Sequence, residues 1–182
     1  YSVFATDDRL CLAVEKVPDK TVEKSTLPTI FAQVNIKEAI ISADAHFIVP
    51  QSVEQIIEAK ADYLMAVKEN QPTFCAEMEN FFDQAHGVEW EDVSHSFHQE
   101  IDKGHGRIDV RETRVVTDLD WLPNADRWKK LSCLIEVRST RQETGAAASE
   151  TLRRLYISSR KGSAKEFAKW TRQHWHIENR CH

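Results

Sequence analysis

The sequence is poor in the features that mark membrane-spanning, secreted and zinc-binding proteins. No apolar run approaches the roughly 20 residues that a membrane-spanning helix needs. No basic segment followed by an apolar stretch occurs near the N-terminus. The four cysteines lie far apart without a C-x-x-C pair, so neither a zinc ribbon nor a disulfide framework is indicated. We therefore expect a cytoplasmic protein with free thiols and no membrane partner.

The composition is that of a globular domain. The 182 residues are 41% hydrophobic and 29% charged, with five Trp and eight Phe, which is enough for one sizeable core. The net charge of −5 argues against a general polyanion binder. Residues 151–182 nevertheless carry eight Lys or Arg and two acidic side chains, a net +6 that leaves −11 for the rest. Such a basic segment is either a solvated helix face or a surface that contacts phosphates.

Short strands and helices alternate in the first half of the chain, and this alternation favours an α/β core. The strands are short apolar runs, and the helices are marked by apolar spacing and by Pro in the first turn. The expected elements are strands at 1–5, 10–14, 39–43 and 63–67, and helices that begin near Thr26, Pro50 and Pro72.

Strand patterns dominate from residue 93 onward and predict an antiparallel region. Ser163 and Glu166 form a capping box that predicts a final helix to about Asn179. Phe167, Trp175 and Glu178 share one face of that helix. The strands are expected at 93–100, 108–116, 131–141 and 152–159, with Gly145 in a hairpin turn.

Two carboxylates are the leading candidates for chemistry. Asp44 ends an apolar strand, where open α/β sheets place ligands, although a turn or cap role is the alternative. Glu178 lies on an aromatic helix face and needs Arg, Lys or a metal as a partner. Distant carboxylates of this kind bind Mg²⁺ for two-metal phosphoryl displacement. Zinc is not indicated, because His174 and His176 point to different sides of a helix.

The segment 103–107 (KGHGR) joins an imidazole and a guanidinium at a turn. Two glycines permit a tight turn there. Arg107 is suited to pair with a phosphate or with a carboxylate, and a structural salt bridge is an equal alternative.

Six stretches in order make the chain resemble the H-repeat-associated insertion-sequence transposases, within the DDE superfamily with a ribonuclease H-like core. They extend over nearly the whole chain. They are 41–45 (ISADA), 61–73 (ADYLMAVKENQPT), 102–111 (DKGHGRIDVR), 118–123 (DLDWLP), 156–159 (YISS) and 174–179 (HWHIEN).

The resemblance implies an α/β, ribonuclease H-like mixed sheet flanked by helices, with an antiparallel β-rich insertion before the final helix. Residues 1–92 would be the first part of the core, 93–160 the insertion and 161–182 the helix that carries the Glu. It implies that Asp44 and Glu178 are the second and third catalytic carboxylates and bind Mg²⁺ or Mn²⁺. Double-stranded DNA, as transposon ends and target, would be the substrate, and a homodimer would act on it. The residues implied in DNA binding or site support are Lys103, His105, Arg107, Lys169, Arg172 and His174.

The chain departs from the family's pattern at several positions. The family's first catalytic Asp lies upstream of the first strand and is not in this sequence, so we expect the polypeptide alone to be inactive. Val49 stands where the family has Gln, and Thr171 and His174 stand where the wider superfamily has Tyr and Arg.

Two other functions are kept open. One is a stand-alone ribonuclease H-like nuclease, which would need Asp7, Asp8 or Asp62 as a replacement carboxylate near Asp44. The other is a non-catalytic DNA-binding remnant that uses the basic segment 151–182.

Overall fold

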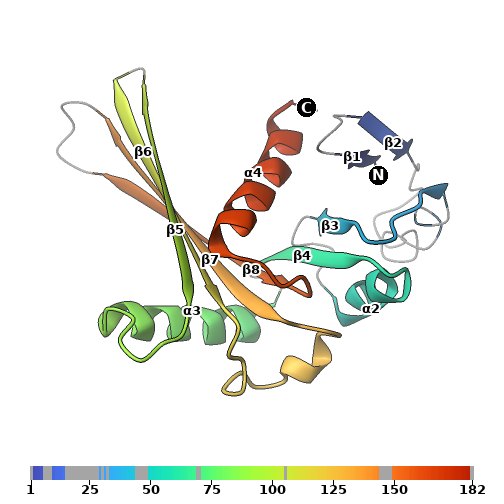
Figure 1. Ribbon diagram of the computed structural model, residues 1–182, viewed down its shortest axis with the longest axis horizontal. Coiled ribbons are helices and arrows are strands. Elements are labelled where there is room, and N and C mark those ends of the chain that lie inside the picture. Colours follow the sequence, from blue (N-terminus) through green and yellow to red (C-terminus); the bar gives the residue numbers. More distant parts are fainter. Residues whose placement is uncertain are drawn as a thin grey trace.

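The computed structural model shows one mixed sheet with helices on both faces (Figure 1). It is the α/β architecture that the sequence predicts. The structure describes residues 2–5, 10–14, 29, 31, 33–43, 49–68, 71–104, 106–143 and 149–180. Within these ranges, only the backbone is described at residues 2–5, 10–14 and 174–180.

The main sheet has six strands in the order β3-β4-β8-β7-β6-β5. Only β3 and β4 are parallel, and every other neighbouring pair is antiparallel. The strands expected between residues 93 and 160 therefore continue the same sheet as the first βαβ unit. The strands are β3 (Ile40–Ala43), β4 (Asp62–Val67), β5 (Ser96–Gly104), β6 (Arg107–Val116), β7 (Cys133–Glu143) and β8 (Glu150–Ser158). Strands β1 (Ser2–Ala5) and β2 (Leu10–Val14), both predicted as strands, pair antiparallel in a separate two-stranded sheet.

Two helices cover one face of the sheet and a third crosses the other (Figure 1). Helix α2 (Pro50–Glu58) and helix α3 (Pro72–Gly87) both begin with Pro in the first turn, where its missing N–H costs nothing. Helix α4 (Ala164–Arg180) lies on the opposite face. Within the described ranges, no helix combines the length and the apolar character needed to cross a membrane.

The larger core lies under α2 and α3. The central strand β4 is buried almost throughout, which is why it reads as an unbroken apolar run instead of an alternating one. Phe82 and Met78 of α3 are fully buried, and each such side chain stabilises the fold by about 1.5–3 kcal/mol. Phe81 of the same helix is only half-buried and stacks on Trp121 with ring centroids 4.1 Å apart.

The smaller core lies between the sheet and α4. Phe167 of α4 is fully buried against apolar side chains of β4, β6, β7 and β8. Ile40 of β3 packs at its margin. The sheet therefore separates the two cores, and the buried side chain of Phe167 anchors α4 to the sheet.

Strand β5 begins later and ends later than the sequence pattern predicts. Residues 93–95 are not in the strand, because backbone turns follow α3 and both Trp90 and Asp92 adopt positive φ angles of 66° and 60°. At the other end, pairing with β6 continues as far as Gly104. The expected helix near Thr26 and the turn at Gly145 fall largely or wholly outside the described residues. Cys75 and Cys133 are free thiols, as predicted, and burial raises the pKa of Cys133 to about 12.

Candidate active site on the helix α4 face of the sheet

Strand β3 leads into Asp44. Asp44 itself lies outside the described residues, but it directly follows Ala43, the last residue of β3. Side chains alternate along the described strand: Ile40 packs against the α4 core, whereas Ile41 and Ala43 pack against the larger core. Strand β3 therefore contributes side chains to both cores.

The start of helix α4 is held by the predicted capping box. The Ser163 N–H and the Ser163 hydroxyl each donate to Glu166 Oε2 at 2.8 Å, and the Glu166 N–H donates to Ser163 Oγ at 3.4 Å. The Ala164 N–H donates to Ser96 Oγ of strand β5 at 2.7 Å. Three N–H groups at the helix start are thereby satisfied, one of them by the sheet itself.

Helix α4 presents a buried stripe to the sheet. Phe167 is buried there, and so is Thr171 one turn later, whose hydroxyl donates to the Phe167 carbonyl at 2.8 Å. His174 and Glu178 lie in the helix, and their side chains are outside the described residues. The described part of the chain thus fixes the helix face but not the two carboxylates.

Asp62 does not fit the role of a replacement carboxylate. It pairs with Ile40 at the beginning of the parallel β3–β4 pair, whereas Asp44 follows the other end. Ala43, the last residue of β3, lies three residues further along the strand than Ile40, a rise of roughly 10 Å. Asp62 also accepts hydrogen bonds from Ser159 Oγ at 2.8 Å and Arg160 Nη1 at 3.3 Å. It therefore joins β4 to the end of β8. Asp7 and Asp8 lie outside the described residues.

The predicted turn at 103–107 is the tip of the β5–β6 hairpin. Gly104 and Arg107 face each other across a two-residue connection, and Gly106 has a φ of +73°, a conformation that favours glycine. Arg107 does pair with a carboxylate, since its Nε lies 2.9 Å from Asp109 Oδ2. His105 lies outside the described residues.

A second arginine, Arg141 of β7, also pairs with Asp109, and the sequence analysis did not single it out. Its Nε donates to Asp109 Oδ1 at 2.8 Å. Arg141, and then Arg107, hold the pKa of Asp109 below its usual value. Two-residue alternation along 107–109 could have shown that Arg107 and Asp109 share a face, but only the β6–β7 register brings in Arg141.

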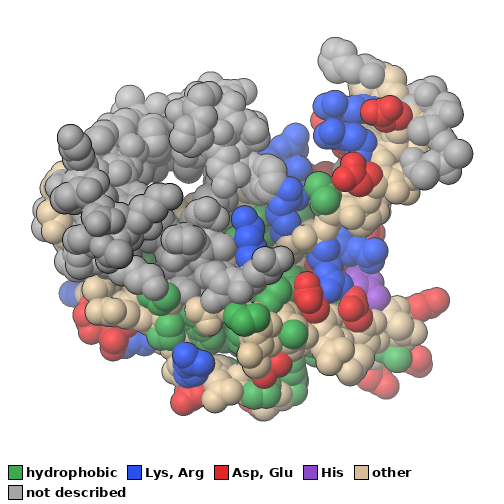
Figure 2. Space-filling model, turned by 180° about the vertical axis from the view of Figure 1, so that it is seen from behind, with side chains coloured by type: hydrophobic (Ala, Val, Ile, Leu, Met, Phe, Trp, Pro, Cys, Tyr) green, Lys and Arg blue, Asp and Glu red, His purple; other side chains and the backbone are tan. Residues whose placement is uncertain are grey.

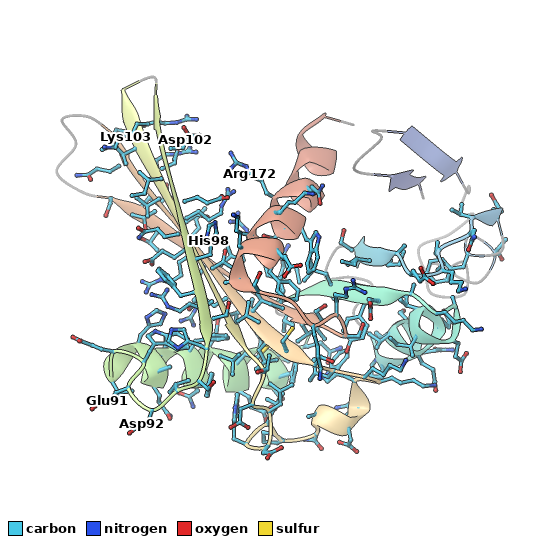
Figure 3. All side chains as sticks on the ribbon, in the orientation of Figure 1. Glu91, Asp92, His98, Asp102, Lys103 and Arg172 are labelled. Atoms are coloured by element: carbon cyan, nitrogen blue, oxygen red, sulfur yellow. The ribbon has the colours of Figure 1, made fainter. Side chains whose placement is uncertain are left out.

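The remaining basic candidates lie on two elements. Lys103 is exposed near the hairpin tip, and Lys169 is exposed on α4. Arg172 of α4 projects toward β5, with its Nη1 3.5 Å from Glu100 Oε2 (Figure 3). Basic and acidic side chains are intermixed on the projecting arm of the sheet (Figure 2). The structure thus brings Arg172 of α4 into contact with β5, whereas Lys103 and Lys169 are exposed on two different elements.

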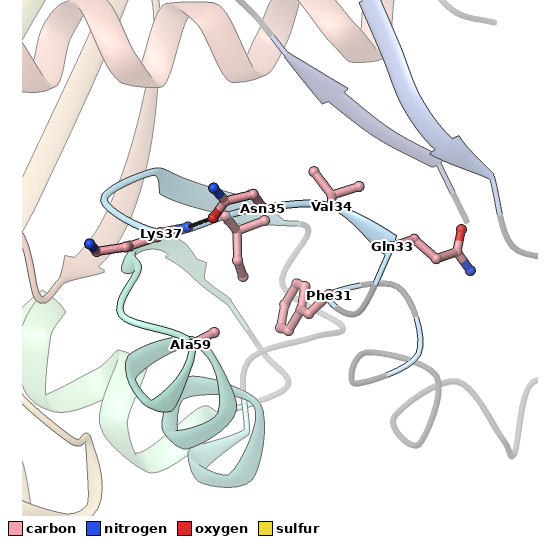
Figure 4. Close-up of a pocket in the computed structure, with 7 residues that line it drawn as sticks. Phe31, Gln33, Val34, Asn35, Lys37 and Ala59 are labelled. Carbon is pink, nitrogen blue, oxygen red and sulfur yellow. Dashed lines mark hydrogen bonds between the residues drawn. The ribbon is translucent and has the colours of Figure 1, made fainter.

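No group of three or more His, Cys, Asp or Glu capable of holding a metal occurs among the described residues, which exclude the side chains of Asp44 and Glu178. An open pocket of about 360 Å³ lies beside residues 33–37 and the end of α2 (Figure 4). Among the described residues of its lining, Lys37 is the one ionisable side chain, and no carboxylate, His or Cys accompanies it there.

Comparison with known proteins gives consistent matches. The family model described as "Transposase DDE domain" matches residues 2–182. YbfL and the "H repeat-associated putative transposase YhhI", both of Escherichia coli strain K12, are each 31% identical over 186 residues. YncI of Escherichia coli O157:H7 is 32% identical over 184 residues. These alignments cover 100% of this chain but only 46–48% of the relatives, so the chain spans about half their length. No solved structure gives a significant match.

The capping box gives a test of how α4 is held. The Ser163 N–H and hydroxyl lower the pKa of Glu166, so its charged form stabilises the folded state. That contribution is present above the carboxyl pKa of the unfolded chain, about 4.3, and is lost as the pH falls through the lower folded value. Glu166→Gln should therefore lower the free energy of unfolding at neutral pH but not below the folded pKa. Urea unfolding across this pH range measures the difference, and identical pH profiles for both proteins would contradict the assignment.

Proposed function

The chain belongs to the family of transposases with a DDE domain, and we propose on that premise that it forms part of a catalytic core for DNA transposition. The reaction would be metal-dependent cleavage and transfer of DNA strands at the ends of an insertion sequence. One structural observation carries the proposal: helix α4 packs on the same face of the sheet as Ile40 of β3, the strand that Asp44 directly follows. Helix α4, which contains Glu178, and strand β3, which precedes Asp44, thus contact the same core.

Asp44 and Glu178 are the proposed catalytic carboxylates. Their oxygens are the donors that Mg²⁺ or Mn²⁺ prefers, so the donor set fits the implied metal. When bound, such ions activate the attacking oxygen and stabilise the leaving oxygen of an in-line displacement. Buried Phe167 and the cap at Ser163 would hold Glu178 at a set height along α4.

Two carboxylates supply too few ligands for two ions. We therefore propose that a third carboxylate comes from sequence outside these 182 residues and that the chain alone does not catalyse strand transfer. The whole enzyme would act as a homodimer on paired ends. Strand transfer by this chain on DNA carrying the element's ends, with Mg²⁺ or Mn²⁺, would contradict this account.

The DNA-contacting residues are proposed to lie on α4 and at the hairpin tip. Lys169 and Arg172 project from α4, the helix that carries Glu178. Lys103 and Arg107 flank the turn, and His105 and His174 are candidates for the same surface. Arg107 is already held by Asp109, so its guanidinium would offer only its remaining donors to a phosphate.

Metal binding tests the assigned carboxylates directly. Asp44→Asn and Glu178→Gln should each weaken Mn²⁺ binding by about tenfold or more, because each removes a ligand. Electron paramagnetic resonance titration of free Mn²⁺ gives the affinities. Asp62→Asn is the matched control, since it makes the same change at the other end of the β3–β4 pair, and it should leave binding unchanged. Equal losses in the Asp44 and Asp62 variants would refute the assignment.

Salt-dependent DNA binding tests the α4 surface. Lys169→Gln should weaken binding to all sequences alike and reduce the slope of log affinity against log salt by about 0.9, one phosphate contact. Lys129→Gln is the control, because Lys129 is exposed and bonds to Glu54 at 2.9 Å on the α2 side. Fluorescence anisotropy over a salt series measures both. Matching affinities and slopes for the two variants would exclude Lys169 from the contact.

These two measurements, together with a nuclease assay, separate the alternatives. DNA binding that falls with salt, without Mn²⁺ binding at Asp44, would identify a non-catalytic DNA-binding remnant. Metal-dependent cutting of any sequence, abolished by Asp44→Asn, would identify a stand-alone nuclease.

A further inference from the structure

Strand β5 is a long, open edge of the main sheet. It pairs only with β6 and has nine residues, without Pro and without a bulge in its register. Phe97 and Ile101 on the α3 side of this strand are 48% and 57% exposed. Natural edge strands are usually short, bulged, interrupted by Pro or covered, because an open edge offers unpaired N–H and C=O groups. Apart from its charged residues, β5 has none of these protections among the described residues.

The hairpin geometry shows which backbone groups face outward. Gly104 and Arg107 close the two-residue turn, so Gly104 belongs to a pair that is hydrogen-bonded to β6. Hydrogen-bonded and non-hydrogen-bonded pairs alternate in an antiparallel ladder. The even-numbered residues of β5 therefore bond to β6. The N–H and C=O groups of odd-numbered Phe97, Gln99 and Ile101 point to the open edge.

We propose that a second copy of this chain pairs with that edge, β5 against β5 in antiparallel orientation, across a two-fold axis at Gln99. The outward-facing groups then meet: Gln99 bonds to Gln99 of the other copy, and Phe97 bonds to Ile101. The two six-stranded sheets become one continuous sheet. The second copy is the partner in the homodimer of the proposed function, but this strand pairing depends on neither the metal ligands nor the DNA contacts.

Side-chain complementarity selects this register. Residues opposite each other in such a pair lie on the same face of the sheet. On the α3 face, Phe97 lies opposite Ile101, two exposed apolar side chains that cover each other. On the α4 face, His98 lies opposite Glu100 of the other copy. Within one chain, His98 Nε2 already lies 3.7 Å from Glu100 Oε1. Each contact occurs twice, as a two-fold interface requires.

The neighbouring registers are worse. A shift that centres the axis on Glu100 places two Glu100 carboxylates opposite each other and sets Phe97 against Lys103. A shift that centres it on His98 places two His98 side chains opposite each other and sets Phe97 against Gln99. Two carboxylates directly opposite each other are destabilising, and both shifts lose the apolar pair. Charge complementarity thus favours a second copy of this strand in the Gln99-centred register.

Sedimentation velocity on the 182-residue chain tests the interface, with Gln99→Pro as the disrupting variant. Proline removes the outward N–H of Gln99 in each copy, so both central bonds are lost, while pairing with β6 does not use that group. Gln99→Ala is the matched control: it loses the same side-chain bond to Glu112 but keeps the N–H. The wild-type chain and Gln99→Ala should be dimers, and Gln99→Pro should dissociate at least about tenfold more readily.

A cross-link tests the register even where Gln99→Pro perturbs folding. In the proposed pair the two Cα atoms at position 99 lie about 5.5 Å apart, which suits a disulfide. The two Cα atoms at position 103 lie about 27 Å apart and cannot be bridged. Mild oxidation should give a covalent dimer with Gln99→Cys, and none beyond the wild-type background with Lys103→Cys.

Three results would overturn the proposal. The first is a wild-type chain that stays monomeric at high concentration, which would also be the outcome if another strand of the same chain covered β5. The second is a dimer that Gln99→Pro leaves intact while circular dichroism shows a folded protein. The third is equal cross-linking of the two cysteine variants. None of these results bears on Mn²⁺ binding at Asp44, so failure here is distinct from failure of the catalytic assignment.

Discussion

The pairing of β4 with β8 is the interaction on which the rest of this structure depends. It pairs residues that are 88 to 94 positions apart in the sequence and makes one sheet of the first βαβ unit and the later antiparallel strands. The junction is reinforced by side chains, since the Ser158 hydroxyl donates to the Tyr63 carbonyl and the Tyr63 N–H donates to Ser159 Oγ at 3.0 Å. Five residues separate the end of β8 from the start of α4, so this pairing also sets where along the sheet α4 begins.

Local patterns predicted most elements because their causes are local. The Ser163–Glu166 box has the predicted bonds, and the two Pro-initiated helices begin where expected. What the patterns could not supply was pairing between distant strands. No local signal shows that β8 lies beside β4, or that Asp109 is shared by Arg107 and Arg141. The start of β5 was also predicted too early, because turns after α3 occupy residues that have strand-like composition.

The family resemblance and the structure support each other at different levels. Motifs near Asp44 and Glu178 suggested the family, and the family model matches residues 2–182. The structure adds that the helix that contains Glu178 and the strand that precedes Asp44 contact one core, which includes Phe167 with Ile40 at its margin. The same sheet has its open edge at β5, on the far side from β3. Catalysis and self-association would therefore use separate edges of one sheet.

The most direct test is the distance between the carboxylates of Asp44 and Glu178 in a crystal structure grown with Mn²⁺. Two catalytic ions lie about 3.5–4 Å apart, so carboxylates that share them must cluster. The account predicts a separation under roughly 8 Å, with both groups on the α4 face of the sheet. Carboxylates on opposite sides of the sheet would contradict the active-site assignment, whatever the family resemblance.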